Sequence, residues 1–235
     1  TEMKTVQTEP IEGQKPGTSG LRKKTRVFMQ PNYLENFVQS TFNALGGAVG
    51  KTYIVSGDGR YFNDKAIQTI LKMAEANGAA KVIVGQSGLL STPAASHLIR
   101  VNKTDGGFIL SASHNPGGID QDFGIKFNTP NGGPAPESIT EGIFENTKTI
   151  SSYQISSSPD VDLNSKGAKN MGEMEVEIVD PVAEYVALME TLFDFDAIRA
   201  LFASGFTMRF DAMHAITGPY AKTILEDKLG AARGT

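Results

Sequence analysis

Segments with a strand pattern and segments with a helix pattern alternate along this chain of 235 residues. Short apolar runs predict strands at residues 52–55, 82–84, 108–110, 123–127, 176–179 and 206–210. Apolar side chains that recur every three or four positions predict helices at residues 34–45, 66–74, 92–100, 137–148, 181–192, 195–202 and 220–229. Such alternation favours a layered α/β fold in which helices pack on a sheet. The direction of each strand stays open, so the pattern allows a mixed sheet as well as a parallel one.

Residues typical of helix starts support two of these helices. Asn32 followed by Glu35 has the pattern of a capping box, in which each side chain bonds to the other residue's backbone. Thr92 followed by Pro93 predicts a second helix start, with the Thr92 hydroxyl as the cap.

Three expectations concern the connecting segments: a loop at residues 16–20, a short strand at residues 27–29 and a surface excursion at residues 151–172.

Charge and composition exclude several classes of protein. The net charge of −4 argues against a protein that binds nucleic acid through a basic surface. The chain has no cysteine, which excludes disulfides, thiolate metal sites and cysteine nucleophiles. No apolar run approaches the roughly 18 residues of a membrane span, and residues 1–10 lack the apolar centre of a signal peptide. A cytoplasmic globular protein is therefore expected.

The stretch most informative for function follows the expected strand at residues 108–110. It reads Ser111-Ala-Ser-His-Asn-Pro-Gly-Gly118 and combines hydroxyls, an imidazole and an amide with two glycines that permit close backbone approach. Ligands of α/β proteins gather where strands end. Taken alone, these residues also fit a polar turn without a chemical role.

The segment 111–118 resembles the active-site loop of the α-D-phosphohexomutases. Three more segments resemble the phosphoglucomutase branch of that family and occur in the same order, at residues 15–24, at 122–128 together with 131–137, and at 211–220. The resemblance covers nearly the whole chain. It implies a layered mixed-sheet domain I at residues 1–193 and the beginning of a similar domain II at residues 194–235, in a family whose members have four α/β domains.

The resemblance also implies a role for each of several residues. Ser113 would carry a phosphoryl group, and its phosphate would bind Mg²⁺. The expected catalytic residues are Ser113, His114, Lys126 and Arg22, and the expected phosphate- or substrate-binding residues are Thr18, Ser19, Arg22, Asn115 and Lys126. A guanidinium and an ammonium group suit this chemistry, because phosphoryl transfer spreads negative charge over the equatorial oxygens.

The implied reaction interconverts glucose 1-phosphate and glucose 6-phosphate through glucose 1,6-bisphosphate. Two alternatives stay open: a sister hexomutase that acts on mannose or N-acetylglucosamine phosphates, and a non-catalytic structural or vesicle-associated phosphoprotein. The family's aspartate-rich metal loop and its later sugar-recognition loops have no counterpart in these residues. We therefore expect the 235 residues alone not to turn over the sugar phosphates.

Other polar residues have simpler interpretations. Asp58 between two glycines, in Gly57-Asp-Gly-Arg60, indicates a tight turn rather than a metal site. Lys126 lies between Ile125 and Phe127, so strand alternation sends its side chain to the opposite face. His97 and His214 are expected to be structural, and Lys23 and Lys24 to be solvated.

Overall fold

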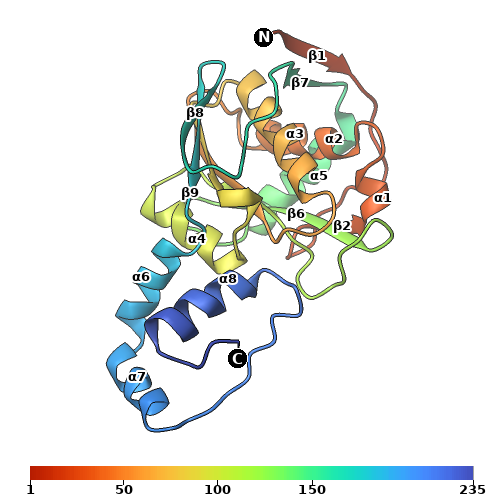
Figure 1. Ribbon diagram of the computed structural model, residues 1–235. Coiled ribbons are helices and arrows are strands. Elements are labelled where there is room, and N and C mark those ends of the chain that lie inside the picture. Colours follow the sequence, from red (N-terminus) through yellow and green to blue (C-terminus); the bar gives the residue numbers. More distant parts are fainter. Residues whose placement is uncertain (235) are drawn as a thin grey trace.

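The computed structural model describes residues 1–234 and contains a seven-stranded mixed sheet between two layers of helices (Figure 1). The order across this sheet is β2 (Leu21–Lys24), β6 (Asp122–Asn128), β5 (Gly107–Leu110), β3 (Thr52–Gly57), β4 (Lys81–Gly85), β9 (Met174–Val179) and β8 (Gly167–Met171). The four strands β5, β3, β4 and β9 are parallel. The outer strands β6, β2 and β8 pair antiparallel with their neighbours. The expected mixed α/β architecture is confirmed.

Each face of the sheet is covered by helices with their own core. One core contains side chains of α2 (Tyr33–Ala44), α3 (Asn63–Ala76) and α5 (Glu137–Thr149). The other contains side chains of α4 (Thr92–Val101), α6 (Ala183–Leu192) and α8 (Thr217–Ala221). The central strands are buried on both faces, which explains why their sequences are largely continuous apolar runs.

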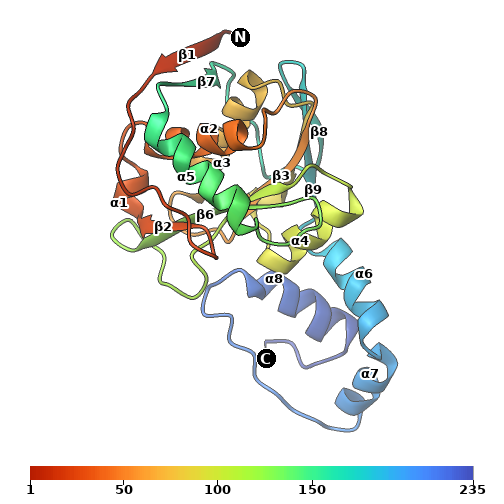
Figure 2. The same ribbon diagram turned by 180° about the vertical axis from the view of Figure 1, so that it is seen from behind.

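The remaining elements extend this framework at its two ends. β1 (Met3–Gln7) and β7 (Ser152–Ser156) form a separate antiparallel pair at one end of the molecule, and α7 (Phe195–Ala203) lies at the other (Figure 2). Three short helical segments complete the chain: α1 (Thr25–Phe28), a 3₁₀ turn at Gln86–Gly88 and a π-helical segment at Lys222–Lys228, which continues α8.

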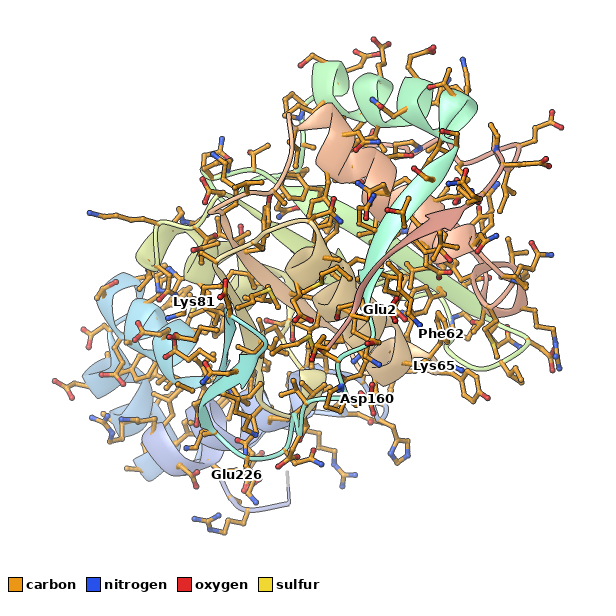
Figure 3. The ribbon with its side chains drawn as sticks, turned by 90° about the horizontal axis from the view of Figure 1, so that it is seen from above. Glu2, Phe62, Lys65, Lys81, Asp160 and Glu226 are labelled. Atoms are coloured by element: carbon orange, nitrogen blue, oxygen red, sulfur yellow. The ribbon has the colours of Figure 1, made fainter. Side chains whose placement is uncertain are left out.

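The parallel strands begin on one side of the molecule and end on the other. Viewed from above, Lys81 at the start of β4 and Phe62 at the start of α3 lie on opposite sides (Figure 3). The turn between β3 and α3 therefore belongs to the edge where parallel strands end. The loop after β5 leaves the sheet at the same edge, since β5 is parallel to β3.

Of the two predicted helix caps, one is present and the other lies one residue earlier in the chain. The reciprocal capping box of Asn32 and Glu35 is present at the start of α2. At α4 the cap is Ser91, whose side chain accepts a hydrogen bond from the amide of Ala94, and Thr92 is already helical. The prediction of Thr92 as the cap was wrong by one residue, because Ser91 carries an equally suitable hydroxyl.

The expected strand at residues 27–29 was wrong, because residues 27 and 28 are helical. The strand at residues 21–24 was not predicted, and the mostly exposed stretch 151–172 contains two strands. These strands depend on pairing with distant strands, such as β2 with β6. The expected strand at residues 206–210 is absent. This segment is largely exposed, and no strand within residues 1–234 pairs with it.

Large apolar side chains are exposed along the segment that contains α7. The most exposed are Leu192, Phe193, Phe206 and Met213, each with at least half of its surface open to solvent. The division into domains at residue 193 stays a prediction. Among the described residues, no helix is long and apolar enough to cross a membrane.

Aromatic packing at the centre of the first core gives a direct test of stability. Phe108 is fully buried and makes ring contacts with Phe42, Tyr53 and Phe127 at centroid distances of 5.6, 6.2 and 5.4 Å. We expect Phe108→Ala to lower the free energy of unfolding by about 3–5 kcal/mol, because it leaves a cavity. Chemical denaturation measures the change. The matched control is Phe206→Ala, at a ring that is 50% exposed. Equal losses in both variants would contradict this description of the core.

Candidate active site

The segment that contains Ser113 forms an exposed loop at the end of β5. Ser113 has a φ of +55°, in the left-handed region that residues with a side chain rarely adopt. Its Oγ lies 3.3 Å from Nδ1 of His114, and both side chains face solvent. The loop therefore presents a hydroxyl and an imidazole together at the sheet edge.

The two serines of this loop have different surroundings. Ser111 Oγ donates a hydrogen bond to Asp58 Oδ2 at 3.0 Å and accepts one from the Ser113 amide at 3.0 Å. Ser113 Oγ has only His114 as a side-chain partner among the described residues. The hydroxyl that is exposed and available to an incoming group is thus that of Ser113.

Arg22 and Lys126 reach this region from neighbouring strands. Arg22 lies opposite Gly124 in the pairing of β2 with β6, and a Cβ at Gly124 would lie 2.2 Å from the Ser111 carbonyl oxygen and 3.2 Å from Arg22 Cγ. Lys126 is two residues further along β6 and so shares a face with Gly124. The expected alternation at Lys126 is confirmed, since Ile125 and Phe127 belong to the core on the other face.

The positive charges of Arg22 and Lys126 are not neutralised locally. Neighbouring Lys24 and Arg60 form ion pairs, whereas Arg22 and Lys126 form none within residues 1–234. Arg22 Nε is buried without a hydrogen-bond partner there. Burial lowers the pKa of Lys126, and the nearby charge of Arg22 lowers it further. Two partly buried cations without a carboxylate partner make a region suited to an anion.

The turn that carries Thr18 and Ser19 lies next to Lys126. Gly17 and Gly20 close this turn through mutual backbone hydrogen bonds of 2.9 and 3.0 Å. Gly20 has a φ of +88°, and a Cβ there would lie 2.5 Å from Lys126 Cβ, so only glycine fits. Thr18 and Lys126 line a common pocket, and both hydroxyls of the turn are exposed.

The other candidates are placed as follows. Asn115 is half-buried, and its amide donates to Asp122 Oδ2 at 3.0 Å, so its side chain already has a partner in the loop. His97 lies within α4, and His214 is exposed with a φ of +59°. Neither histidine approaches the Ser113 loop through any hydrogen bond in the described part of the chain.

Comparison with known proteins identifies the family. The family model "Phosphoglucomutase/phosphomannomutase, alpha/beta/alpha domain I" matches residues 13–154, which is more than half of the chain. The chain belongs to this family. The match includes the Ser113 loop, both cations and the Thr18 turn.

Curated relatives agree with this assignment. A phosphoglucomutase of Rhizobium radiobacter is 58% identical over 233 residues, which cover 99% of this chain and 43% of the relative. A chloroplastic phosphoglucomutase of Brassica napus is 55% identical over 233 residues, which cover 98% of this chain and 37% of the relative. Relatives of similar identity include enzymes named cytoplasmic. The chain spans less than half the length of these relatives.

A solved structure has the same fold. The crystal structure of the Paramecium exocytosis-sensitive phosphoprotein pp63/parafusin, a phosphoglucomutase in its open form, superposes with a TM-score of 0.94 at 46% identity. The alignment covers 98% of this chain and 44% of the Paramecium chain. The phosphohexomutase domain I architecture expected from the sequence is confirmed.

Asp58 and Arg60 contact the Ser113 loop, a role that the sequence analysis did not predict. Arg60 forms a bidentate ion pair with Asp58 and donates to the carbonyl oxygens of Ser113, Asn115 and Asp122 at 2.9–3.0 Å. Within Gly57–Arg60, Gly59 has a φ of +84° and the Arg60 amide donates to Asp58 Oδ1 at 3.3 Å, so the chain bends here and brings Arg60 against a second loop. In the sequence, the signal for this role was an acidic and a basic residue in a glycine-containing segment at the end of a strand.

The described residues do not provide a complete metal site. Residues 1–234 contain no group of three or more carboxylate, histidine or cysteine side chains able to hold an ion. Both carboxylate oxygens of Asp58, the acidic residue bonded to Ser111, already accept hydrogen bonds from Arg60. The donor set here therefore does not fit Mg²⁺ by itself, because that ion favours several oxygen ligands in octahedral geometry.

Lys126 gives a test of the charge balance in this family domain. Between its lowered pKa in the folded protein and the ordinary value of 10.5, the unfolded chain binds more protons than the folded chain. Folding stability should therefore rise with pH through that window. We expect Lys126→Met to be more stable than wild type at neutral pH, with a difference that shrinks as the pH nears 10.5.

The measurement is denaturant unfolding of both proteins at several pH values. The control is Lys65→Met, which removes an exposed lysine of α3 (Figure 3). A Lys126→Met protein less stable than wild type at neutral pH would mean that the ammonium group stabilises the fold.

Proposed function

We propose that this chain carries the phosphoserine site of a phosphoglucomutase, which interconverts glucose 1-phosphate and glucose 6-phosphate. One arrangement carries the proposal: the loop with the exposed Ser113 hydroxyl begins at Ser111, and the Cβ position of Gly124 lies within 3.2 Å of both the Ser111 carbonyl oxygen and Arg22 Cγ. Arg22 and the neighbouring Lys126 are cations without ion-pair partners in residues 1–234. The names of the relatives support the same activity.

The proposed chemistry is phosphoryl transfer between Ser113 and the sugar. The bond from Ser113 Oγ to phosphorus breaks while a sugar hydroxyl oxygen bonds to the same phosphorus. The hydroxyl loses a proton and Ser113 Oγ gains one, so the step is balanced. His114 Nδ1, 3.3 Å from Ser113 Oγ, is close enough to supply that proton or to orient the phosphate.

Positive charge would stabilise this transfer. Arg22 offers paired N–H donors that suit the phosphate oxygens, and Lys126 offers a compact charge. Thr18 and Ser19 add hydroxyls on the turn beside Lys126. A phosphate on Ser113 would give the two cations the anion that the described residues lack.

The intermediate of the proposed cycle is glucose 1,6-bisphosphate. The phosphorylated serine would convert a monophosphate into this bisphosphate, which would turn around and return its other phosphate to Ser113. Holding the intermediate nearby makes the second transfer effectively unimolecular. Mg²⁺ belongs to the proposal as an ion that offsets phosphoryl charge, with the Ser113 phosphate as one ligand and the others from outside the described residues.

The alternatives are less well supported. A sister hexomutase would use the same serine, but the relatives with 54–58% identity are named phosphoglucomutases. The phosphoprotein description belongs to the Paramecium protein, which is also named a phosphoglucomutase. We keep the cytoplasm as the proposed location, although relatives occur in chloroplasts as well.

Labelling distinguishes the two serines of the loop. The intact protein is incubated with glucose 1,6-bisphosphate labelled in its phosphates, and the modified residue is mapped by mass spectrometry. We expect the label on Ser113, because Ser111 Oγ is engaged by Asp58 and by the Ser113 amide. Ser113→Ala should abolish labelling and turnover. Label on Ser111, or an active Ser113→Ala protein, would overturn the assignment.

Removal of Arg22 tests the anion site. We expect Arg22→Ala to lower the kcat of the intact protein on the order of a hundredfold or more, because a positioned donor to the developing charge is lost. Steady-state assays with glucose 1-phosphate measure the effect, and circular dichroism checks the fold. Lys23→Ala on the same strand is the matched control, since Lys23 is exposed. Normal turnover in Arg22→Ala would remove Arg22 from the site.

A further inference from the structure

The guanidinium of Arg60 has every N–H donor in use. Nε donates to the Asp58 carboxylate at 3.0 Å, and one terminal nitrogen donates to the carbonyl oxygens of Asn115 and Asp122 at 3.0 and 2.9 Å. The other terminal nitrogen donates to Asp58 Oδ2 at 2.9 Å and to the Ser113 carbonyl oxygen at 3.0 Å. Arginine has five such donors in a fixed plane. All of them hold protein groups, and three of these groups are backbone carbonyls, two in the loop after β5 and one at the first residue of β6.

Asp58 holds the backbone amide of Ser113 indirectly, through the Ser111 side chain. Its Oδ2 accepts the Ser111 hydroxyl at 3.0 Å, and Ser111 Oγ in turn accepts the Ser113 amide at 3.0 Å. The carbonyl of Ser113 is bound by Arg60, and its amide is bound through Ser111 by Asp58. The ion pair thus fixes both backbone polar groups of the residue whose hydroxyl would carry the phosphate.

The backbone of Ser113 needs such support. Its φ of +55° is unfavourable for a residue with a side chain and persists only where the surroundings impose it. Neighbouring Gly117 packs against the same arginine, because a Cβ at Gly117 would lie 2.9 Å from Arg60 Cβ. The loop is therefore shaped around the Arg60 side chain over at least five residues.

The side chains of this pair are largely shielded from solvent and bonded to the protein. The side chains of Arg60 and Asp58 are only 7% and 13% exposed. Since every donor of Arg60 is occupied, its guanidinium has none left for a phosphate oxygen. Its contribution to a reaction at Ser113 must therefore act through the loop.

We propose that Asp58 and Arg60 are positioning residues that hold the Ser113 hydroxyl in the orientation needed for phosphoryl transfer. The proposal rests on the proposed function for its kinetic part and on the structure alone for its geometric part. A misplacement of the reacting atom by about 1 Å can cost on the order of a hundredfold in rate. Lysine cannot replace Arg60, because an ammonium group lacks the planar fork that reaches Asp58 and three carbonyls at once.

The test compares Arg60→Lys and Asp58→Asn with Arg26→Lys in the intact protein. Arg26 is a matched control, because it forms an exposed ion pair with Asp120 in the same loop. The kinetic readouts are kcat and KM for glucose 1-phosphate at a temperature where each variant is folded. The geometric readout is hydrogen exchange at the amides of Ser113 and Asn115, which needs no activity.

For Arg60→Lys and Asp58→Asn we expect a kcat about a hundredfold lower with KM near the wild-type value. Exchange at the two amides should be at least about tenfold faster. Arg26→Lys should match wild type in every readout. A folded Arg60→Lys protein with normal kcat or with unchanged exchange overturns the proposal.

Two other outcomes are also decisive. If neither variant at Asp58 or Arg60 folds, the pair is a determinant of folding and the positioning proposal is overturned. If the wild-type intact protein lacks phosphoglucomutase activity, the proposed function fails. In that case the exchange rates still decide whether the pair holds Ser113.

Discussion

The antiparallel pairing of β6 with β5 is the constraint on which the candidate site depends. The parallel strands alone would end in a loop with a serine and a histidine. Because β6 returns beside β5 with Lys126 opposite Ile109, and β2 then pairs with β6, two cations are carried back to the edge where that loop leaves the sheet. The period-two alternation of a strand sends these side chains away from the aromatic core and toward the loop.

The charges of Lys126 and Arg22 reduce the stability of the folded protein. Burial disfavours the charged form of Lys126, and Arg22 adds like-charge repulsion without a carboxylate to relieve it. A fold optimised for stability alone would pair or remove such charges. Polar groups held in unfavourable surroundings are common where a protein binds a ligand of the opposite charge. The structure thus supports an anion site on energetic grounds that do not depend on the sequence resemblance.

The sequence predicts the parts of this structure that have local signals. Apolar runs mark the central strands 52–57, 81–85 and 107–110, and helical periodicity marks α2 and α3. Strand β2 was missed, because Leu21–Lys24 is mostly polar and exists through its partner β6. Residues 206–210, with apolar side chains at 206, 208 and 210, look like a strand, yet no described strand pairs with them. Apolar composition alone does not make a strand, because a strand also needs a neighbour to complete its hydrogen bonds.

The contacts that shape the candidate site are the least predictable part. Arg60 and Ser113 are separated by 53 positions, and no local pattern links them. The two arginines near the loop also differ in their hydrogen bonding, which the residue type does not reveal. Arg22 keeps a buried N–H without a partner in residues 1–234, whereas Arg60 has every donor bound to the protein. Hydrogen-bond saturation therefore separates an arginine that can take an anion from one that can only build the loop around it.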